Sequence, residues 1–387
     1  MHRVCRAVSS GPASPLHALG ASRLSTMYDL IGDIHGHATE LVLLLEQLGY
    51  ERRNGVFSHP QRKVIFLGDL IDRGPQIQEV LDIARPMVEQ GYAHAILGNH
   101  ELNALGYHTP HPKRPGRHLR ERNDRTTRQH EATLRQLDEH QIKSALEWFR
   151  TLPLWLDLDG LRAVHACWDD SSREALARGL ADHGGITNTW LHAACVPGAP
   201  LFSHAEVLLK GKEAKLPHGI AFFDKDGHER RSFRTRWYSD PRGQSYRSYA
   251  LETAVIPSTA PLAPWIIDAG IPYPSDAKPV FFGHYWLRPD RPSPLASNVA
   301  CLDYSIGKGG LLCAYRWNGE QILREENFSW IPSVHSHAHA HPHHGPAIAS
   351  HTPDISVPGM SLPAIPSPVH ATEADKPDSS GAAAPSN

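Results

Sequence analysis

The stretch VIFLGDLIDRG, residues 64–74, decides the fold expected for this chain. Residues 64–67 are apolar and favour β-structure, and the run ends abruptly at Gly68, directly before Asp69. A run of this length fits a buried strand and is too short for a helix. Because α/β folds carry their chemistry at the carboxyl ends of strands, we expect Asp69 to lie at a functional edge of a sheet.

The same pattern, an apolar segment followed by Asp, Asn or His, recurs at four other places. The residues that follow these segments are Asp33 and His35 in GDIHG, Asn99 and His100 in GNHE, His165 after residues 163–164, and His284 after residues 280–282. Carboxylate and amide oxygens and imidazole nitrogens suit Mn, Fe, Zn or Mg. A single Asp can bridge two such ions about 3.5–4 Å apart. The five segments together therefore predict a two-metal site.

The motifs GDIHG, GDLIDRG and GNHE, in this order, resemble the calcineurin-like metallophosphoesterases. Within that family they resemble the branch of PPP-type serine/threonine phosphatases and symmetrical diadenosine tetraphosphatases. The resemblance runs from residue 27 to about residue 320. It implies an α/β sandwich of two mixed β-sheets flanked by helices, with a dinuclear metal site at the carboxyl ends of the strands.

The resemblance also implies a ligand set for two divalent metal ions, with Mn expected first and Fe, Zn or Mg as alternatives. The implied ligands are Asp33 and His35 for the first metal, Asp69 as the bridge, and Asn99, His165 and His284 for the second metal. Taken singly, Asp or Asn residues after strands are often turn residues or helix caps. The ordered set is what favours metal binding.

Three further residues take catalytic roles by the same resemblance. A hydroxide that bridges the metals attacks phosphorus in line, and Arg73 stabilises the charge on the phosphoryl oxygens. His100 protonates the leaving oxygen as general acid, and Asp72 orients His100. The implied activity is metal-dependent phosphoester hydrolysis.

Two substrate classes stay open. One is a phosphorylated protein, hydrolysed by a serine/threonine-phosphatase-like phosphomonoesterase, and the alternative is a nucleotide polyphosphate, cleaved as by a symmetrical dinucleoside tetraphosphatase. A non-catalytic metal-binding scaffold is a third hypothesis, which the presence of His100 and Asp72 disfavours. A second substrate arginine is expected, with Arg234 and Arg236 as candidates between which the sequence does not choose.

Two positions depart from the protein-phosphatase pattern. That pattern has His-Gly-Gly where this chain has His165-Ala166-Cys167, and a literal His-Gly-Gly occurs only at residues 183–185. We prefer His165 because it follows an apolar segment. Trp286 stands where many metallophosphoesterases have another His, so the first metal should have fewer protein ligands. We interpret Cys167 as a buried structural thiol rather than a nucleophile.

The remaining elements follow from local patterns. We expect helices over residues 39–48, with Thr39 as cap, over residues 75–90, kinked or shortened by Pro86, and over residues 132–149. Asp159-Gly160 predicts a hairpin turn. Residues 281–286 should form a strand ending at His284, and residues 298–304 and 310–317 closing antiparallel strands. Residues 107–130 are rich in Arg and His and form either a solvated loop or a basic lid for polyanionic substrates.

The bulk composition narrows the function classes. A net charge of −2 gives no case for nucleic-acid or membrane binding, and no apolar run approaches 18 residues. The five Cys show no CxxC spacing, which favours a reducing compartment, and we expect a cytoplasmic protein.

Three regions are predicted along the chain. Residues 1–26 form an N-terminal extension, either a mis-assigned start or a transit-type peptide that would make the protein organellar, since they are basic and lack acidic residues. Residues 27–332 form the metallophosphoesterase domain. Residues 333–387 are a disordered tail rich in His, Pro and Ala, whose run of histidines at 335–344 either is solvated or binds metal loosely.

Overall fold

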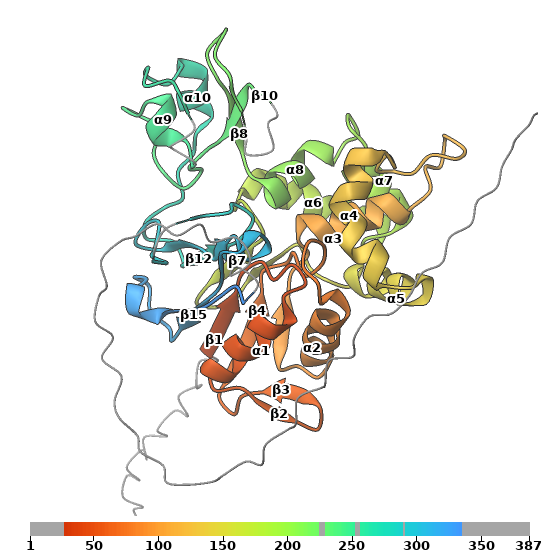
Figure 1. Ribbon diagram of the computed structural model, residues 1–387. Helices are drawn as coiled ribbons and strands as arrows, with labels where there is room; N and C mark the ends of the chain where they lie inside the picture. Colours follow the sequence, from red (N-terminus) through yellow and green to blue (C-terminus); the bar gives the residue numbers. More distant parts are fainter. Residues whose placement is uncertain (1–26, 224–228, 252–255, 289–290, 335–387) are drawn as a thin grey trace, which may run out of the picture. The chain divides into compact units, whose positions relative to one another are not determined.

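The computed structural model describes residues 27–223, 229–251, 256–288 and 291–334 (Figure 1). The predicted extension at 1–26 and residues 335–387 of the predicted tail, with its histidine run, lie outside the described residues. Ser333 and Val334 do belong to the described part, and Ser333 is buried.

A six-stranded mixed sheet carries the first three sequence motifs. Its strands are β1 (Met27–Ile31), β4 (Arg62–Phe66), β5 (Ala93–Ala95), β14 (Asp303–Tyr304), β15 (Leu311–Trp317) and β16 (Phe328–Pro332). β1 pairs in parallel with β4, and β4 pairs in parallel with β5. The carboxyl ends of these three strands therefore lie at one edge of the sheet, as the sequence pattern predicted.

A second sheet of four strands carries two of the predicted ligands, His165 and His284. Its strands are β6 (Trp155–Asp157), β7 (Arg162–Val164), β12 (Val280–Phe282) and β13 (Val299–Cys301). β6 and β7 form the antiparallel hairpin predicted from Asp159-Gly160. β12 pairs in parallel with both β7 and β13, so the prediction that residues 298–304 form only antiparallel strands was wrong for β13.

The two sheets pack face to face, as expected for a sandwich. Leu30 and Ile65 of the first sheet and Ala163 and Phe281 of the second belong to one buried apolar cluster, and none of the four is exposed. Alternate residues on the same strands, such as Phe66 and Phe282, point the other way and belong to a cluster shared with the helices. The model thus confirms the predicted α/β sandwich of mixed sheets flanked by helices.

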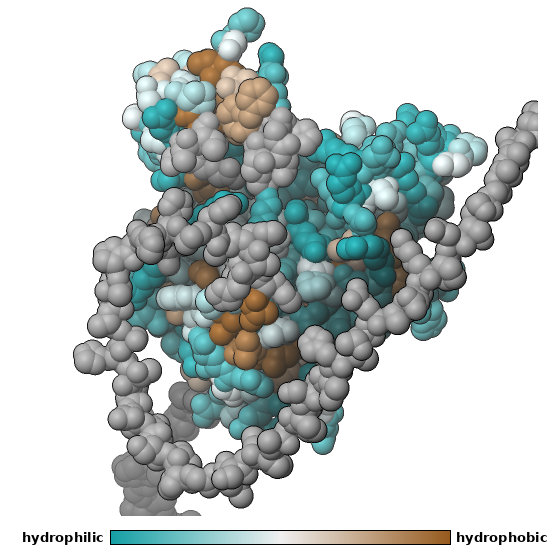
Figure 2. Space-filling model, viewed as in Figure 1, coloured by the Kyte–Doolittle hydropathy of each residue, from teal (hydrophilic) through white to brown (hydrophobic). Residues whose placement is uncertain are grey.

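The described part of the chain contains eight helices of eight or more residues. They are α1 (Ala38–Gln47), α2 (Ile77–Glu89), α3 (Asn99–His108), α4 (Asp124–Gln136), α5 (Glu139–Phe149), α6 (Asp170–His183), α7 (Asn188–Cys195) and α8 (Phe202–Lys210). α1 and α2 contact each other beside the first sheet (Figure 1). On the face drawn in Figure 2 the surface is mainly hydrophilic, and hydrophobic residues gather over α1, the helix with the exposed Leu43.

Several predicted boundaries needed correction. The helix expected over residues 132–149 is two helices, because Leu137 is extended and Asp138 caps α5 by accepting a hydrogen bond from Gln141 N. The segment 107–130 is a loop only between α3 and α4. Thr39 is not the cap of α1; its backbone N–H and its hydroxyl instead donate to Gln76 Oε1.

A predicted strand end also differs from the structure, whereas the predicted end of a helix agrees within one residue. α2 includes Pro86 and continues to Glu89, so the proline stands within the helix near its end. β12 stops at Phe282 rather than at His284, because His284 has a left-handed backbone with φ of 74° that cannot continue a strand.

The part of the chain between His165 and His284 forms a smaller apolar cluster. It centres on Phe233 and Tyr246 and is built from short elements. These are β8 (Glu213–Lys215), β11 (Ser232–Arg234), α9 (Tyr246–Tyr249) and α10 (Pro264–Ala269), with the paired strands β9 (Phe222–Phe223) and β10 (Glu229–Arg230) nearby.

The remaining described elements are short. They are the paired strands β2 (Glu51–Arg53) and β3 (Val56–Ser58) and the 3₁₀-helices η2 (Ile306–Lys308) and η3 (Glu325–Asn327). No helix among the described residues is both long and apolar enough to cross a membrane.

Candidate metal centre

Loops from both sheets deliver the predicted ligands to one place. Asp33 and His35 follow β1, Asp69 follows β4, and Asn99 begins α3 just after β5. His165 directly follows β7, and His284 follows β12 in the other sheet. Since all these strands run in parallel within their own sheets, their carboxyl ends bring the loops together.

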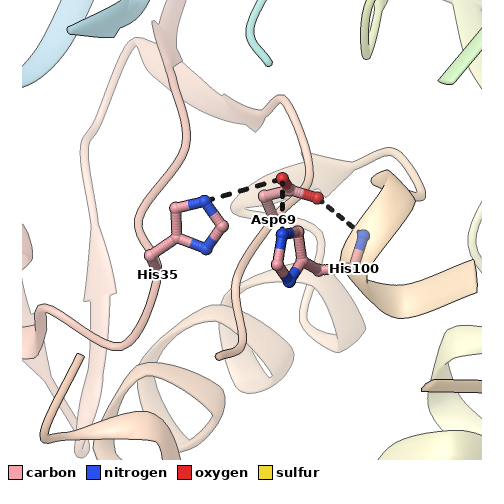
Figure 3. A group of neighbouring side chains, drawn as sticks. All are labelled: His35, Asp69 and His100. Atoms are coloured by element: carbon pink, nitrogen blue, oxygen red, sulfur yellow. Dashed lines mark hydrogen bonds and ion pairs between the residues drawn. The ribbon is translucent and has the colours of Figure 1, made fainter. Parts of the chain in front are cut away.

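Asp69 lies at the centre of this cluster. Its Oδ2 is 3.6 Å from His35 Nε2 and 3.9 Å from His100 Nε2 (Figure 3), and its Oδ1 is 3.4 Å from His165 Nε2. Two groups of potential ligand atoms, each within 4.8 Å of one another, share this carboxylate: His35, Asp69 and His100, and Asp69, His165 and His284. One carboxylate common to two groups is the arrangement that a bridging ligand requires.

Asn99 and Asp33 complete the cluster. Asn99 Oδ1 lies 3.1 Å from His165 Nε2 and 2.6 Å from His284 Nδ1. The backbone N–H of His284 donates to both oxygens of Asp33, at 3.2 and 3.1 Å. The structure therefore brings together all six residues predicted as ligands, and each is no more than 6% exposed.

Two observations from the structure indicate that the six predicted ligands suit divalent cations. His35 Nε2 and His284 Nε2 are buried and have no hydrogen-bond partner among the described residues, although buried polar nitrogens are nearly always paired. Burial, together with the neighbouring Asp303 and Asp69, raises the pKa of Asp33 well above its usual range. Cations placed among these groups would pair the nitrogens and stabilise the charged carboxylates.

Asp69 and the histidines influence one another's protonation. Burial would raise the pKa of Asp69, but the charges of His165 and His100 outweigh it and hold this pKa well below its usual range. Burial and the charge of His100 lower the pKa of His35 to about 3, and burial with Arg234 lowers the pKa of His284. His35 and His284 are therefore neutral at pH 7, as metal-binding imidazoles must be.

The backbone of the site adopts rare conformations. Among the described non-glycine residues with positive φ, five belong to the predicted site: His35 (47°), Asp69 (49°), Asp72 (68°), Arg73 (71°) and His284 (74°). Such left-handed residues are uncommon and each carries a conformational cost, and they concentrate at functional sites. The tertiary structure thus holds these side chains in a geometry that an isolated segment would not keep.

Glu101 is a site residue to which sequence reasoning gave no role. It is fully buried, and its two carboxylate oxygens accept hydrogen bonds from the backbone of Asp69 (2.9 Å), Leu70 (2.8 Å) and Gly98 (3.0 Å). Burial and the charge of Asp69 raise the pKa of Glu101 to about 7. Its place in GNHE, directly after His100, was the only signal in the sequence.

His100 and Asp72 form the pair expected from the sequence, and two residues of α4 extend it. His100 Nδ1 lies 2.5 Å from Asp72 Oδ2, while His130 Nδ1 lies 2.7 Å and Thr133 Oγ1 2.5 Å from Asp72 Oδ1. Burial would raise the pKa of Asp72, but the hydrogen bonds from His100 and His130 lower it overall. No sequence motif marks His130 or Thr133, since only the packing of α4 brings them to the site.

The structure separates the two candidates for a second arginine. The guanidinium of Arg234 lies over the ring of Tyr285, 5.7 Å from its centroid, directly beside His284. Arg236 instead donates from Nε to the carbonyl of Ala250, so it is used in local packing. Arg73 is exposed, and its guanidinium lies 4.2 Å from the centroid of the Trp286 ring.

Two residues that the sequence analysis excluded from the site, His183 and Cys167, have structural roles. His183 is the last residue of α6, and Gly184 ends that helix in a left-handed conformation, which explains the local His-Gly-Gly sequence. Cys167 is fully buried, and burial raises the pKa of its thiol. A thiol with a raised pKa is a poor nucleophile.

Comparison with known proteins identifies the family. The model of the family described as calcineurin-like phosphoesterase matches residues 28–245. This match confirms the family named from GDIHG, GDLIDRG and GNHE.

Curated relatives match only part of the chain. The asymmetrical bis(5'-nucleosyl)-tetraphosphatase PrpE of Anoxybacillus flavithermus is 49% identical over 75 residues, which is 19% of this chain and 31% of the relative. The protein of the same name from Bacillus subtilis is 43% identical over 74 residues, 19% of this chain and 30% of the relative. The chain thus spans about a third of the length of these relatives.

Solved structures align with most of the chain at low similarity. A putative diadenosine tetraphosphatase is 16% identical with a TM-score of 0.37, covering 81% of this chain and 96% of that one. A protein serine/threonine phosphatase from Saccharomyces cerevisiae is 13% identical with a TM-score of 0.41, covering 83% of each chain. A cold-active protein-tyrosine phosphatase of Shewanella is 16% identical with a TM-score of 0.42, covering 80% of each chain.

Proposed function

Because this chain belongs to the calcineurin-like phosphoesterase family, we propose that it is a metal-dependent hydrolase of phosphoester or phosphoanhydride bonds. Members of the family generally use a dinuclear site for divalent metals. The observation that carries the proposal is the shared position of Asp69 in two groups of ligand atoms, with the His100–Asp72 pair directly beside it.

The proposed ligands are those that the family resemblance implies. Asp33 and His35 would hold one cation, Asn99, His165 and His284 the other, and Asp69 both. The grouping of His35, Asp69, His165 and His284 and the contact between Asn99 and His284 support this set. Two bound cations supply an activated water near neutral pH and polarise the phosphoryl oxygens. We propose Mn²⁺ as the first metal to test, with Fe, Zn and Mg as alternatives, because the mixed oxygen and nitrogen ligands suit all four.

The protein side chains supply the remaining steps. Arg73 is exposed beside the site and can bind two phosphoryl oxygens with its planar guanidinium. His100 can donate the proton on Nε2 to the leaving oxygen, because Asp72 holds its Nδ1 at 2.5 Å and so orients the ring. Arg234 is our candidate for the second substrate arginine, since it lies beside His284.

We propose two substrate classes. The first, as expected from the sequence, is phosphoserine or phosphothreonine hydrolysed by a phosphomonoesterase, and the His100–Asp72–Arg73 arrangement would serve either class. The names of the curated relatives support a dinucleoside polyphosphate instead, and those names specify asymmetrical cleavage where the sequence motifs had pointed to a symmetrical enzyme.

A side-by-side turnover assay tests the proposal. The full-length protein with Mn²⁺ is given p-nitrophenyl phosphate, a phosphoserine peptide and diadenosine tetraphosphate, and the nucleotide products are resolved as two ADP or as ATP and AMP. We expect turnover of at least one substrate, and His100→Asn should lower it about 100-fold or more. His140→Asn, on the exposed face of α5, is the matched control and should not lower it.

The outcomes separate the hypotheses. Release of phosphate from the peptide alone supports the phosphomonoesterase, and cleavage of the dinucleotide alone supports the nucleotide hydrolase. Tight metal binding with no turnover of any of the three substrates would overturn the proposed hydrolase and support the non-catalytic scaffold.

A further inference from the structure

Two exposed cationic side chains meet at one aromatic ring beside the candidate metal centre. The guanidinium of Arg73 lies 4.2 Å, and Nζ of Lys308 4.5 Å, from the centroid of the Trp286 ring. Neither Arg73 nor Lys308 takes part in an ion pair between the described residues. Both cations lie against the same ring, so their like charges repel each other, and an anion bound beside them would reduce that repulsion.

The ring that gathers these cations is adjacent to a proposed metal ligand. The Trp286 and His35 rings are 5.8 Å apart between centroids. Arg73 follows Asp72 directly, so the ring contacts the same rim that carries the His100–Asp72 pair. Lys308 therefore lies against the same ring as Arg73, the arginine proposed to bind the phosphoryl oxygens.

Hydrogen bonds to one buried carboxylate connect the loop that carries Trp286 with the loop that carries Lys308. Buried Asp303 accepts hydrogen bonds from Trp286 N at 2.7 Å and from Ser305 N at 3.0 Å, one on each carboxylate oxygen. Trp286 and Ser305 both have left-handed backbones, with φ of 56° and 64°. This conformation is rare for such residues and indicates that the surrounding structure holds it in place.

The short helix η2 also lies directly against Arg73. A Cβ placed on Gly307 would lie 3.0 Å from Arg73 Cδ and 3.4 Å from His35 Cδ2. A side chain at residue 307 would therefore press on both residues, and glycine allows Lys308 to approach the rim. Lys308 is built into the edge of the site by its loop and is not a lysine at a random surface position.

We propose that Lys308, which lies with Arg73 against the Trp286 ring, forms a subsite for the second phosphate of a polyphosphate chain. This inference rests on the proposed phosphohydrolase function and adds a substrate class to it. A phosphoserine peptide offers one phosphate, which the metal centre and Arg73 already engage. A nucleoside polyphosphate or dinucleoside polyphosphate extends past that phosphate, and its next anionic group meets the ammonium of Lys308.

Steady-state kinetics with paired substrates test the subsite. Full-length wild type, Lys308→Ala and Lys308→Arg are assayed with Mn²⁺ on p-nitrophenyl phosphate and on diadenosine tetraphosphate. The loss in kcat/KM for Lys308→Ala should be about tenfold greater on the dinucleotide than on the monoester, mainly through KM, and Lys308→Arg should restore most of it. Lys143→Ala, an exposed lysine on α5, is the matched control and should leave both values as in the wild type.

A binding measurement keeps this inference separate from the hydrolase proposal. Calorimetric titration of metal-free protein with tripolyphosphate should show binding that weakens about tenfold in Lys308→Ala and not in Lys143→Ala. Binding with this pattern but no turnover would contradict the proposed activity and leave the subsite standing. Equal losses on both substrates, or tripolyphosphate binding that is the same in wild type and Lys308→Ala, would overturn the subsite.

Discussion

His130 Nδ1 lies 2.7 Å from Asp72 Oδ1, and His100 Nδ1 lies 2.5 Å from the other oxygen of the same carboxylate. Asp72 is therefore held from both sides, by the proposed general acid and by a histidine of α4. His130 Nε2 lies in turn 3.2 Å from His108 Nε2, so the contacts continue away from the site. This relationship makes His130 a positioning residue for the pair.

Replacement of His130 should impair turnover without removing the metal ligands. We expect His130→Ala to lower kcat about tenfold or more, because Asp72 loses one of the partners that orient it. Since the hydrogen bond from His130 lowers the pKa of Asp72, its loss should raise that pKa, and the acidic limb of the kcat profile should move to higher pH. Measurement of kcat across pH, with His140→Ala as control, checks this; an unmoved acidic limb would argue for a purely structural His130.

Asp69→Asn should abolish turnover and metal binding together. The amide keeps the size of the side chain but removes the charge that both groups of ligand atoms share. Metal content by mass spectrometry and turnover are measured on the same preparation, with Asp82→Asn on the exposed face of α2 as the matched control. Near-normal turnover with normal metal content would contradict the assignment of Asp69 as the bridge.

Divalent metal should stabilise the fold against heat. Burial, together with nearby carboxylates, raises the pKa of Asp33 and of Asp303, so a bound cation would favour their charged forms. A ligand that binds only the native state stabilises that state. At 100 times the Kd, Mn²⁺ should add about 2.7 kcal/mol to the free energy of unfolding. Calorimetric melting of the apo protein with and without Mn²⁺ measures this gain, and an equally large gain in Asp69→Asn would place the bound metal elsewhere.

The boundary of the catalytic region can be tested by truncation. We propose that residues 27–334 suffice for folding and turnover, because β16 pairs with β15 and Val334 N donates to Glu40 Oε1 at 2.9 Å. A chain that ends at residue 334 should match the full-length protein in Tm and kcat. A chain that ends at residue 327 loses β16 and buried Phe328, and it should be less stable by about 2 kcal/mol or more. A large loss of Tm or kcat in the chain that ends at residue 334 would show that the residues after 334 contribute to the fold.

The errors in the predicted elements share a physical cause. Residues 132–149 have a helical pattern throughout, yet the chain breaks at Leu137 because Asp138 starts a new helix as its cap. β13 is parallel to β12 because the chain between them crosses over, and no residue pattern within residues 298–304 records that path. Local patterns therefore indicate whether a segment is a helix or a strand better than they indicate which other segments it pairs with.

The sequence by itself determined the family through three ordered motifs, and the resemblance to that family implied the sandwich of mixed sheets. An apolar strand followed by a short polar loop is a local signal, and parallel pairing places all such loops at one edge, so the residue pattern alone was enough to group Asp33, Asp69 and Asn99. Only the tertiary structure decided which outer residues support them. Glu101 accepts hydrogen bonds from four backbone N–H groups, and His130 reaches Asp72 although it lies 58 residues further along the chain. Lys308 and Arg73 both lie against the Trp286 ring. Such contacts depend on how distant segments pack, and that packing has no periodic trace in the sequence.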